Sequence, residues 1–377
     1  MYDEIDAYIR RLVRESSPER TAWNMERVRQ GKPAHWNYID GCMLNALLTL
    51  SDITGDPLYA DFVERFVDAF IAEDGTIRTY DPSKYNLDDI NEGRVLFPLY
   101  EKTGNGKYRR AADSLARQLR DQPRTAEGSF WHKLIYPDQV WLDGVYMAQP
   151  FRALYEKHFG DRDYADILRQ IETVRSRMFD LRKHLYYHGY DATKSIFWAD
   201  PATGCSKNFW LRAIGWFATA LVDLLEIVDD PDGLNRLGLI FVELMEGVAA
   251  YADPGTGMYY QVVDQGGREG NYLETSGSCM IAYAMLKGAR LGWLDESLAA
   301  LGRKTFDGIL RRYLKTEGED VELDGICLVA GLGPADNLRR DGSYEYYISE
   351  PVVKNDAKGV APFVMCYTEI IRSLPPA

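Results

Sequence analysis

The chain has 377 residues, of which 46% are hydrophobic and 27% are charged, a composition typical of a globular protein with a large core. Its formal net charge of −13 argues against nucleic acid as a partner, and no apolar run is long enough to span a membrane. The acidic N-terminus lacks a signal-peptide pattern and the five cysteines are scattered, so we expect a cytoplasmic protein with reduced thiols and no bound metal.

Two kinds of helical segment alternate along the chain. A first amphipathic helix is expected over residues 3–16. A mostly apolar segment follows over residues 36–52, and an amphipathic helix begins after Pro57, with apolar residues at three- and four-residue spacing. The first segment suits a buried position, and the second suits a surface position with one buried face.

The same pair of segments then recurs along the chain. A small residue stands near the start of each apolar helix, at Gly41, Gly93, Gly144, Gly215, Gly277 and Gly359. The last apolar helix has no partner after it, and the helix over residues 3–16 could take that place.

Burying every apolar surface requires apolar helices inside and amphipathic helices outside. The repeats therefore predict an all-α fold, an (α/α)6 barrel of six inner and six outer helices, with residues 1–377 as one domain. An open solenoid is the structural alternative, but six unequal repeats without matching capping repeats favour closure.

The longer connections are expected to form the site. Residues 181–201, 258–271 and 324–347 read as short strands and Gly-rich loops, and each precedes an inner helix. Because the inner helices should all start at the same end of the barrel, these connections gather on one rim.

Two acidic residues stand at neighbouring inner-helix starts on this rim, Asp88 and Asp143. Helix capping alone could explain either one. Neighbouring helix axes lie roughly 8–10 Å apart, so both carboxylates could reach one small molecule. One protonated and one ionised carboxyl group would suit general acid–base catalysis, and we expect Asp143 to carry the proton when substrate binds. Asp89 is an alternative to Asp88.

Aromatic and cationic side chains are predicted at the same level. Aromatic faces pack against sugars, although ordinary core packing would explain some of these residues, which are Trp36, Tyr38, Trp131, Trp141, Tyr146, Trp198, Trp210 and Trp216. Arg212, with His132, Lys133 and His188, would suit a carboxylate. Neither a metal-binding cluster nor a phosphate-binding glycine loop is evident, so no cofactor is expected.

Five blocks of sequence resemble the unsaturated rhamnogalacturonyl hydrolases, glycoside hydrolase family 105. They are His-Lys-Leu-Ile-Tyr-Pro-Asp-Gln-Val-Trp-Leu-Asp-Gly at 132–144, Phe-Trp-Leu-Arg-Ala-Ile-Gly-Trp-Phe at 209–217, Leu-Glu-Thr-Ser-Gly-Ser-Cys-Met at 273–280, Leu-Asp-Asp-Ile-Asn at 87–91 and Tyr-Ile-Ser-Glu-Pro-Val-Val-Lys-Asn-Asp-Ala-Lys-Gly at 347–359. The resemblance spans residues 36–373.

The resemblance implies an (α/α)6 barrel without a metal, acting on short pectin-derived oligosaccharides that end in a 4,5-unsaturated galacturonic acid. It implies Asp143 as general acid/base, with Asp88 assisting. The implied substrate-binding residues are Tyr38, His132, Lys133, Trp141, His188, Trp210, Arg212 and Trp216. Leu211 and Trp131 depart from the family pattern, which leaves the aglycone preference open.

The expected partner is a small anionic oligosaccharide, with no membrane or nucleic acid involved, and the expected state is a monomer or a weak homo-oligomer. Three other functions remain open. An unsaturated glucuronyl hydrolase would use the same barrel and chemistry on glycosaminoglycan disaccharides. A hydrolase of saturated glycans would not need the double bond, and a non-catalytic helical scaffold would bind a peptide in its concave face.

Overall fold

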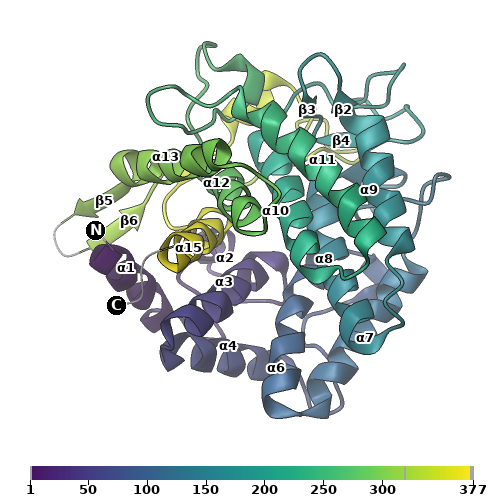
Figure 1. Ribbon diagram of the computed structural model, residues 1–377. Coiled ribbons are helices and arrows are strands. Elements are labelled where there is room, and N and C mark those ends of the chain that lie inside the picture. The colour runs from purple at the N-terminus through teal and green to yellow at the C-terminus, as the bar shows by residue number, and fades with distance from the viewer. Residues whose placement is uncertain (1, 318–319, 374–377) are drawn as a thin grey trace.

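Two rings of helices, one inside the other, form an (α/α)6 barrel (Figure 1). The computed structural model describes residues 2–317 and 320–373. Each inner helix contacts the next and the last contacts the first, so the ring is closed and the predicted barrel is confirmed over an open solenoid. The inner ring consists of α3 (Tyr38–Thr54), a broken segment of α5 (Asp88–Asn91), η2 (Glu92–Val95) and α6 (Leu96–Thr103), and then α8 (Leu142–Phe159), α10 (Leu211–Ile227), α12 (Thr275–Arg290) and α15 (Ala357–Arg372).

The outer ring covers the inner one. It consists of α4 (Pro57–Phe70), α7 (Gly106–Asp121), α9 (Ala165–Met178), α11 (Pro231–Ala249), α13 (Glu296–Tyr313) and α1 (Tyr2–Arg14). The N-terminal helix α1 packs against α15, with the rings of Tyr8 and Phe363 6.5 Å apart. It thereby completes the outer ring, as the sequence predicts.

The two rings differ in polarity because they differ in exposure. Every residue of α10 except Glu226 is buried, as expected for an inner helix. The outer helix α4 buries one stripe, and its start is fixed by the Asp56 cap and by Pro57 in the first turn. None of the described helices combines the length and the apolarity that crossing a bilayer requires.

Short elements gather at the end of the barrel where the inner helices begin. Four two-stranded antiparallel pairs are formed by β1 (Gln139–Trp141) with β4 (Gly189–Asp191), β2 (Phe179–Asp180) with β3 (Leu185–Tyr186), β5 (Leu314–Glu317) with β6 (Asp320–Leu323), and β7 (Ile326–Cys327) with β8 (Val352–Val353). The remaining short helices are α2 (Met25–Gln30), η1 (Pro82–Lys84), η3 (Val263–Gln265) and α14 (Tyr344–Ser349). The sequence pattern did not predict α2.

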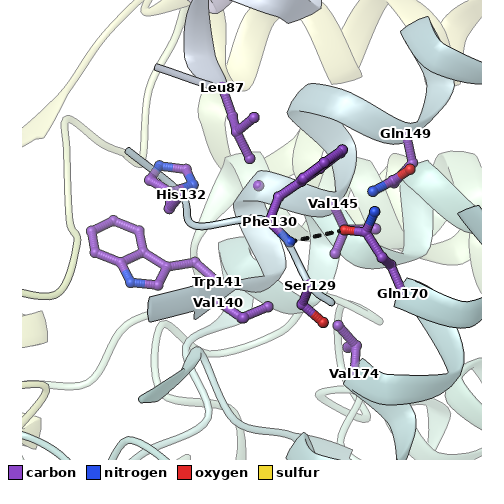
Figure 2. Close-up of a pocket in the computed structure, with 11 residues that line it drawn as sticks. Leu87, Ser129, Phe130, His132, Val140, Trp141, Val145, Gln149, Gln170 and Val174 are labelled. Atoms are coloured by element: carbon purple, nitrogen blue, oxygen red, sulfur yellow. Dashed lines mark hydrogen bonds between the residues drawn. The ribbon is translucent and has the colours of Figure 1, made fainter. Parts of the chain in front are cut away.

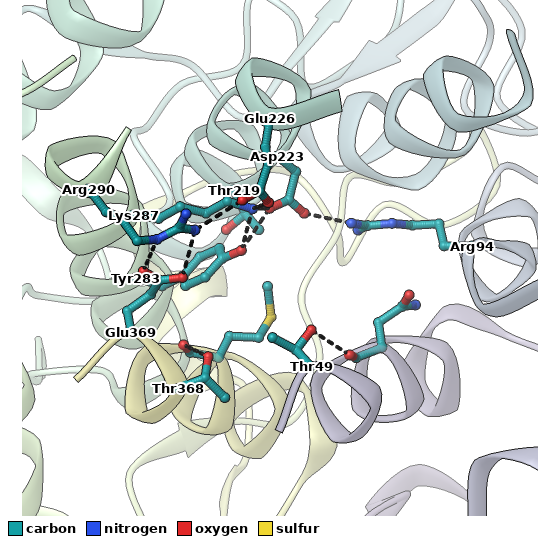
Figure 3. A network of polar contacts seen from close by, with 12 residues as sticks. Thr49, Arg94, Thr219, Asp223, Glu226, Tyr283, Lys287, Arg290, Thr368 and Glu369 are labelled. Atoms are coloured by element: carbon teal, nitrogen blue, oxygen red, sulfur yellow. Dashed lines mark hydrogen bonds and ion pairs between the residues drawn. The ribbon is translucent and has the colours of Figure 1, made fainter. Parts of the chain in front are cut away.

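A network of charged side chains joins the inner helices near their other ends (Figure 3). Asp223 of α10 accepts from both Arg94 of η2 and Lys287 of α12, each at 2.7 Å. Arg290 of α12 pairs with Glu369 of α15 at 2.7 Å. These pairs are buried or partly buried, so they compensate charges that would be costly to leave alone there.

Small residues at the inner-helix starts let neighbouring segments approach closely. A Cβ atom added at Gly41 of α3 would lie 2.6 Å from the Cα atom of Glu92. That contact is with backbone, so no side-chain rotation could relieve it. The recurrent glycine in the sequence therefore marks sites of helix contact rather than turns.

We predict that Gly41→Ala lowers the free energy of unfolding by roughly 1–3 kcal/mol, because α3 and η2 must move apart to admit the methyl group. Urea unfolding followed by circular dichroism measures the change. The control is Gly267→Ala, since nothing lies within 4 Å of a Cβ atom there. Equal stability of the two variants would contradict the prediction.

Candidate active site

The two predicted acids lie at adjacent inner-helix starts. Asp88 is the first residue of α5, and Asp143 lies in the first turn of α8. Pairing of β1 with β4 places Trp141 opposite Gly189, and the Leu142 amide donates to the His188 carbonyl at 3.1 Å. The strand pair thus sets His188 beside the start of α8.

Asp88 is held by two cationic or imidazole groups from the loop before β1. Lys133 Nζ lies 2.6 Å from Asp88 Oδ2, and His132 Nε2 lies 3.4 Å from Oδ1. Burial alone would raise the pKa of Asp88, but Lys133 and His132 outweigh it, so this pKa lies well below its ordinary value. Asp88 is therefore ionised at neutral pH.

Asp143 belongs to a second acid–imidazole pair. His188 Nε2 lies 3.3 Å from Asp143 Oδ2, and on its other side His188 Nδ1 lies 2.7 Å from the hydroxyl of Tyr347. His188 is fully buried. Burial raises the pKa of Tyr347 well above its usual value, so the phenol keeps its proton and can donate it to Nδ1. That assignment leaves Nε2–H facing Asp143.

Trp141 connects the two acid–imidazole pairs. Its ring stacks on His132 with centroids 4.4 Å apart and meets His188 edge-on at 5.6 Å. Figure 2 shows His132 and Trp141 side by side, backed by Val140 and Phe130. The cavity behind them holds only about 10 Å³ of space, too little for the rings to move into. Packing therefore fixes the imidazole of His132.

Gly144 is the residue that lets His132 approach α8. A Cβ atom added there would lie 2.8 Å from His132 Nδ1 and 3.2 Å from the Cδ1 atom of Leu87. The Asp143-Gly144 dipeptide therefore supplies an acid for one pair and room for the imidazole of the other.

The remaining predicted residues lie in two groups. Tyr38 meets the ring of Trp216 edge-on at 6.1 Å, and Tyr38 also lines the same cavity as Asp88. The ring centroids of Trp210 and His188 lie 4.6 Å apart. The guanidinium carbon of Arg212 lies over the Trp210 ring, 4.9 Å from its centroid. Arg212 is buried and donates to the Cys327 carbonyl, so the protein fixes this guanidinium in place.

Asp88 and Asp89 differ clearly in their surroundings. Asp89 is buried away from the cavity, and burial together with the charge of Asp88 raises the pKa of Asp89 to about 7. Its carboxylate accepts a long hydrogen bond from Asn37, at 3.5 Å, and is also bonded by Asn86. Asp88 lines the cavity and contacts Lys133. The geometry therefore favours Asp88 as the acid that faces a ligand.

A cavity of about 350 Å³ opens beside Asp88. Tyr38 and Lys133 line it, as expected, but three further charged residues there were not predicted, namely Glu26, Arg27 and Arg340. Glu26 and Arg27 come from the short helix α2, and Arg340 comes from the loop after β7. The sequences of these two segments show no helical or strand periodicity. Among the described residues, no group of three or more His, Cys, Asp or Glu side chains is arranged to hold a metal ion.

Comparison with known proteins places the chain among carbohydrate-active enzymes. The sequence profile of Glycosyl Hydrolase Family 88 matches residues 9–374. The chain is also 39% identical to a glycoside hydrolase of family 105 from C. acetobutylicum ATCC 824, over 98% of this chain and 99% of that one, with a TM-score of 0.89. The chain belongs to glycoside hydrolase family 88/105.

Two other relatives of this glycosidase differ in what they show. Protein Atu3128 of Agrobacterium fabrum is 42% identical over 229 residues, which is 59% of this chain and 97% of that protein. An unsaturated glucuronyl hydrolase from Bacillus sp. GL1 is only 13% identical, with a TM-score of 0.69 over 99% of this chain and 97% of that one. The second comparison shows a shared barrel and nothing more.

We predict that Asp88 contributes to the stability of the glycosidase in a pH-dependent way. Its folded-state pKa is depressed, so the contribution is present above the unfolded value of about 3.9 and is lost as the pH falls through the folded value. At pH 7, Asp88→Asn should lower the free energy of unfolding by on the order of 2 kcal/mol, and the difference from wild type should narrow between about pH 5 and pH 2. Urea titrations at several pH values measure this. A difference that does not vary with pH would contradict it.

We also predict that the Tyr347 hydroxyl fixes the tautomer of His188. Tyr347→Phe keeps the ring stacked on Trp210 at 5.8 Å but leaves Nδ1 without its partner. Nitrogen-15 NMR of the histidine rings should show the Nε2–H form of His188 in wild type and a mixture in the variant, with kcat about tenfold lower. In the control, Tyr187→Phe removes a hydroxyl that bonds Asp180 outside the site. An unchanged NMR spectrum of His188 would refute the assignment.

Proposed function

We propose that this glycosidase removes a 4,5-unsaturated galacturonic acid from the non-reducing end of rhamnogalacturonan oligosaccharides by hydrating the C4–C5 double bond. The observation that carries the proposal is the unequal state of the two acids. Asp88 is paired with Lys133 and His132, whereas the one charged or imidazole group within ion-pairing distance of Asp143, among the described residues, is His188. Such a site has one carboxylate held by a lysine and one acid that is not held by a cationic side chain among the described residues.

This arrangement suits an enol ether better than an ordinary glycoside. A retaining glycosidase needs a free carboxylate as nucleophile. Asp88 makes a poor nucleophile because its oxygens are held by Lys133 and His132. An ionised carboxylate in a protected site can instead stabilise positive charge that develops during reaction.

The proposed steps use each group once. Asp143 donates a proton to C4 of the unsaturated uronate, and positive charge develops at C5 and the ring oxygen, where the Asp88 carboxylate stabilises it. Water adds at C5 and returns a proton to Asp143. The resulting C5 hemiketal opens by breaking the bond between C5 and the ring oxygen, which gives a C5 ketone and leaves a hemiacetal at C1. Collapse of that hemiacetal then breaks the bond to the aglycone and yields a keto acid with an aldehyde at C1 and the shortened saccharide.

The predicted binding residues provide for the rest of the sugar. One face of each of Trp141, Trp210 and Trp216 already stacks on a protein ring, so in this proposal they contact the sugar through the small part of each ring that stays exposed. Tyr38, which lines the cavity beside Asp88, packs edge-on against Trp216. Arg212 and Lys133 bring to the site the positive charge that an anionic sugar requires in a chain with a net charge of −13, and the imidazoles of His132 and His188 lie beside the two acids.

We predict that Asp143→Asn lowers kcat by roughly 10²- to 10⁴-fold while the protein remains folded, because the variant has no proton to deliver to C4. Turnover is measured as loss of the ultraviolet absorbance of the unsaturated uronate in lyase-treated rhamnogalacturonan. Asp161→Asn, an exposed acid in the loop after α8, is the matched control. The proposal fails if wild-type protein leaves the absorbance unchanged, or if only glycosaminoglycan fragments react.

A further inference from the structure

The cavity beside Asp88 contains more positive charge than its acids can balance. Lys133 is paired with Asp88 at 2.6 Å, and Lys358 is paired with Glu26 at 2.8 Å. Two further arginines line the cavity, Arg27 of α2 and Arg340 of the loop after β7. Among the described residues, no carboxylate lies within ion-pairing distance of either guanidinium.

The neighbouring groups do not cancel these two charges. Glu26 is paired with Lys358, which also pairs with Asp356 at 3.0 Å, and the pKa of Glu26 is lowered because Lys358, with Arg212 and Arg340, outweighs its burial. Burial and the charge of Arg27 lower the pKa of His35 to about 4, so His35 is neutral at pH 7. Two arginines without an ion-paired carboxylate among the described residues thus face one cavity in a strongly acidic chain.

The loop that carries Arg340 is held rigidly against the site. Leu332 is fully buried among Tyr136, Trp141 and Trp198. Trp198 donates its indole N–H to the Gly333 carbonyl at 3.0 Å. A Cβ atom at Gly331 would meet both Arg340 Nη1, at 3.1 Å, and the edge of the Trp141 ring, at 3.4 Å. The guanidinium therefore lies close to the ring that stacks on His132.

We propose that Arg27 and Arg340 form an aglycone subsite that binds an acidic group, either a carboxylate or a sulfate ester, on the saccharide attached to the unsaturated uronate. This inference rests on the proposed function. Under the proposed function the reacting sugar binds at Asp88 and Asp143. Asp88 lines the same cavity as the two arginines, and Asp143 does not line it, so the arginines lie on the Asp88 side of that sugar. Guanidinium groups bind carboxylates and sulfate esters through paired hydrogen bonds, and a partly enclosed cavity strengthens such contacts.

Two matched pairs of substrates test the subsite and identify the acidic group. The first pair is the unsaturated galacturonyl-rhamnose disaccharide and the unsaturated tetrasaccharide that adds one galacturonate and one further rhamnose. The second pair is the unsaturated chondroitin disaccharide without sulfate and its sulfated form. In each pair only the second member has an acidic aglycone, so the first pair tests a carboxylate and the second tests a sulfate ester.

The variants are Arg27→Gln, Arg340→Gln and the double variant. The controls Arg29→Gln and Arg339→Gln remove the same charge from neighbouring positions that do not line the cavity, and Arg339 is paired with Glu350 outside it. Both kcat/KM and the dissociation constant, by calorimetry, are measured for each saccharide. Because Arg27 and Arg340 make no side-chain ion pair, the melting temperature of their variants should stay close to that of wild type.

Wild type is expected to favour the acidic member of at least one pair. Arg340→Gln should lower both the affinity and the kcat/KM for that acidic saccharide roughly 10- to 100-fold. For the neutral member of the same pair, both quantities should change less than about threefold. The subsite is overturned if wild type does not discriminate within either pair, or if both members weaken equally. If no saccharide is turned over but affinity still depends on Arg340 and on the acidic group, the subsite stands and the proposed reaction alone fails.

Discussion

Close contact between the starts of neighbouring inner helices is the constraint on which the site depends. Because Gly144 has no side chain, His132 can pack against the start of α8. His132 in turn contacts Asp88 on the neighbouring segment of the inner ring. Gly215 and Gly277 allow a similar approach between α10 and α12. Because the ring is closed, each helix start is fixed from both sides, and the loop side chains of the candidate site are held in place without a disulfide bond.

Most of the architecture could be predicted because it follows from local patterns. Apolar helices alternate with amphipathic ones, and the Asp143-Gly144 block precedes a long apolar segment. The break in the second inner segment was not predicted. There the Asn37 amide donates to the carboxylate of Glu92, a contact between residues 55 positions apart that no local pattern reveals. Such tertiary contacts override helical periodicity.

The site was predicted less completely than the fold. The sequence pattern predicted that His188 and Asp143 lie on the same rim. It did not predict that Tyr347 contacts His188, because the two residues are 159 positions apart in the chain. Trp36 and Trp198 also stood among the predicted rim aromatics, yet both are fully buried. Trp36 donates to the carbonyl of Asp89 and therefore supports the loop behind the acid. An aromatic residue near an active site can thus act only through packing, and composition cannot distinguish the two roles.

The barrel has a polar hollow at each end, and the two do not meet. The cavity beside Asp88 shares no lining residue with the cavity of about 280 Å³ near the charged network of Asp223 and Lys287. Between them, Tyr146 stacks on Trp216 at 4.8 Å, and Arg94 covers Tyr146 from the network side. Stacked rings and a guanidinium therefore separate these two cavities. Under the proposed function, the shortened saccharide leaves through the opening by which the next substrate enters the cavity beside Asp88. Product and substrate then compete for the same entrance.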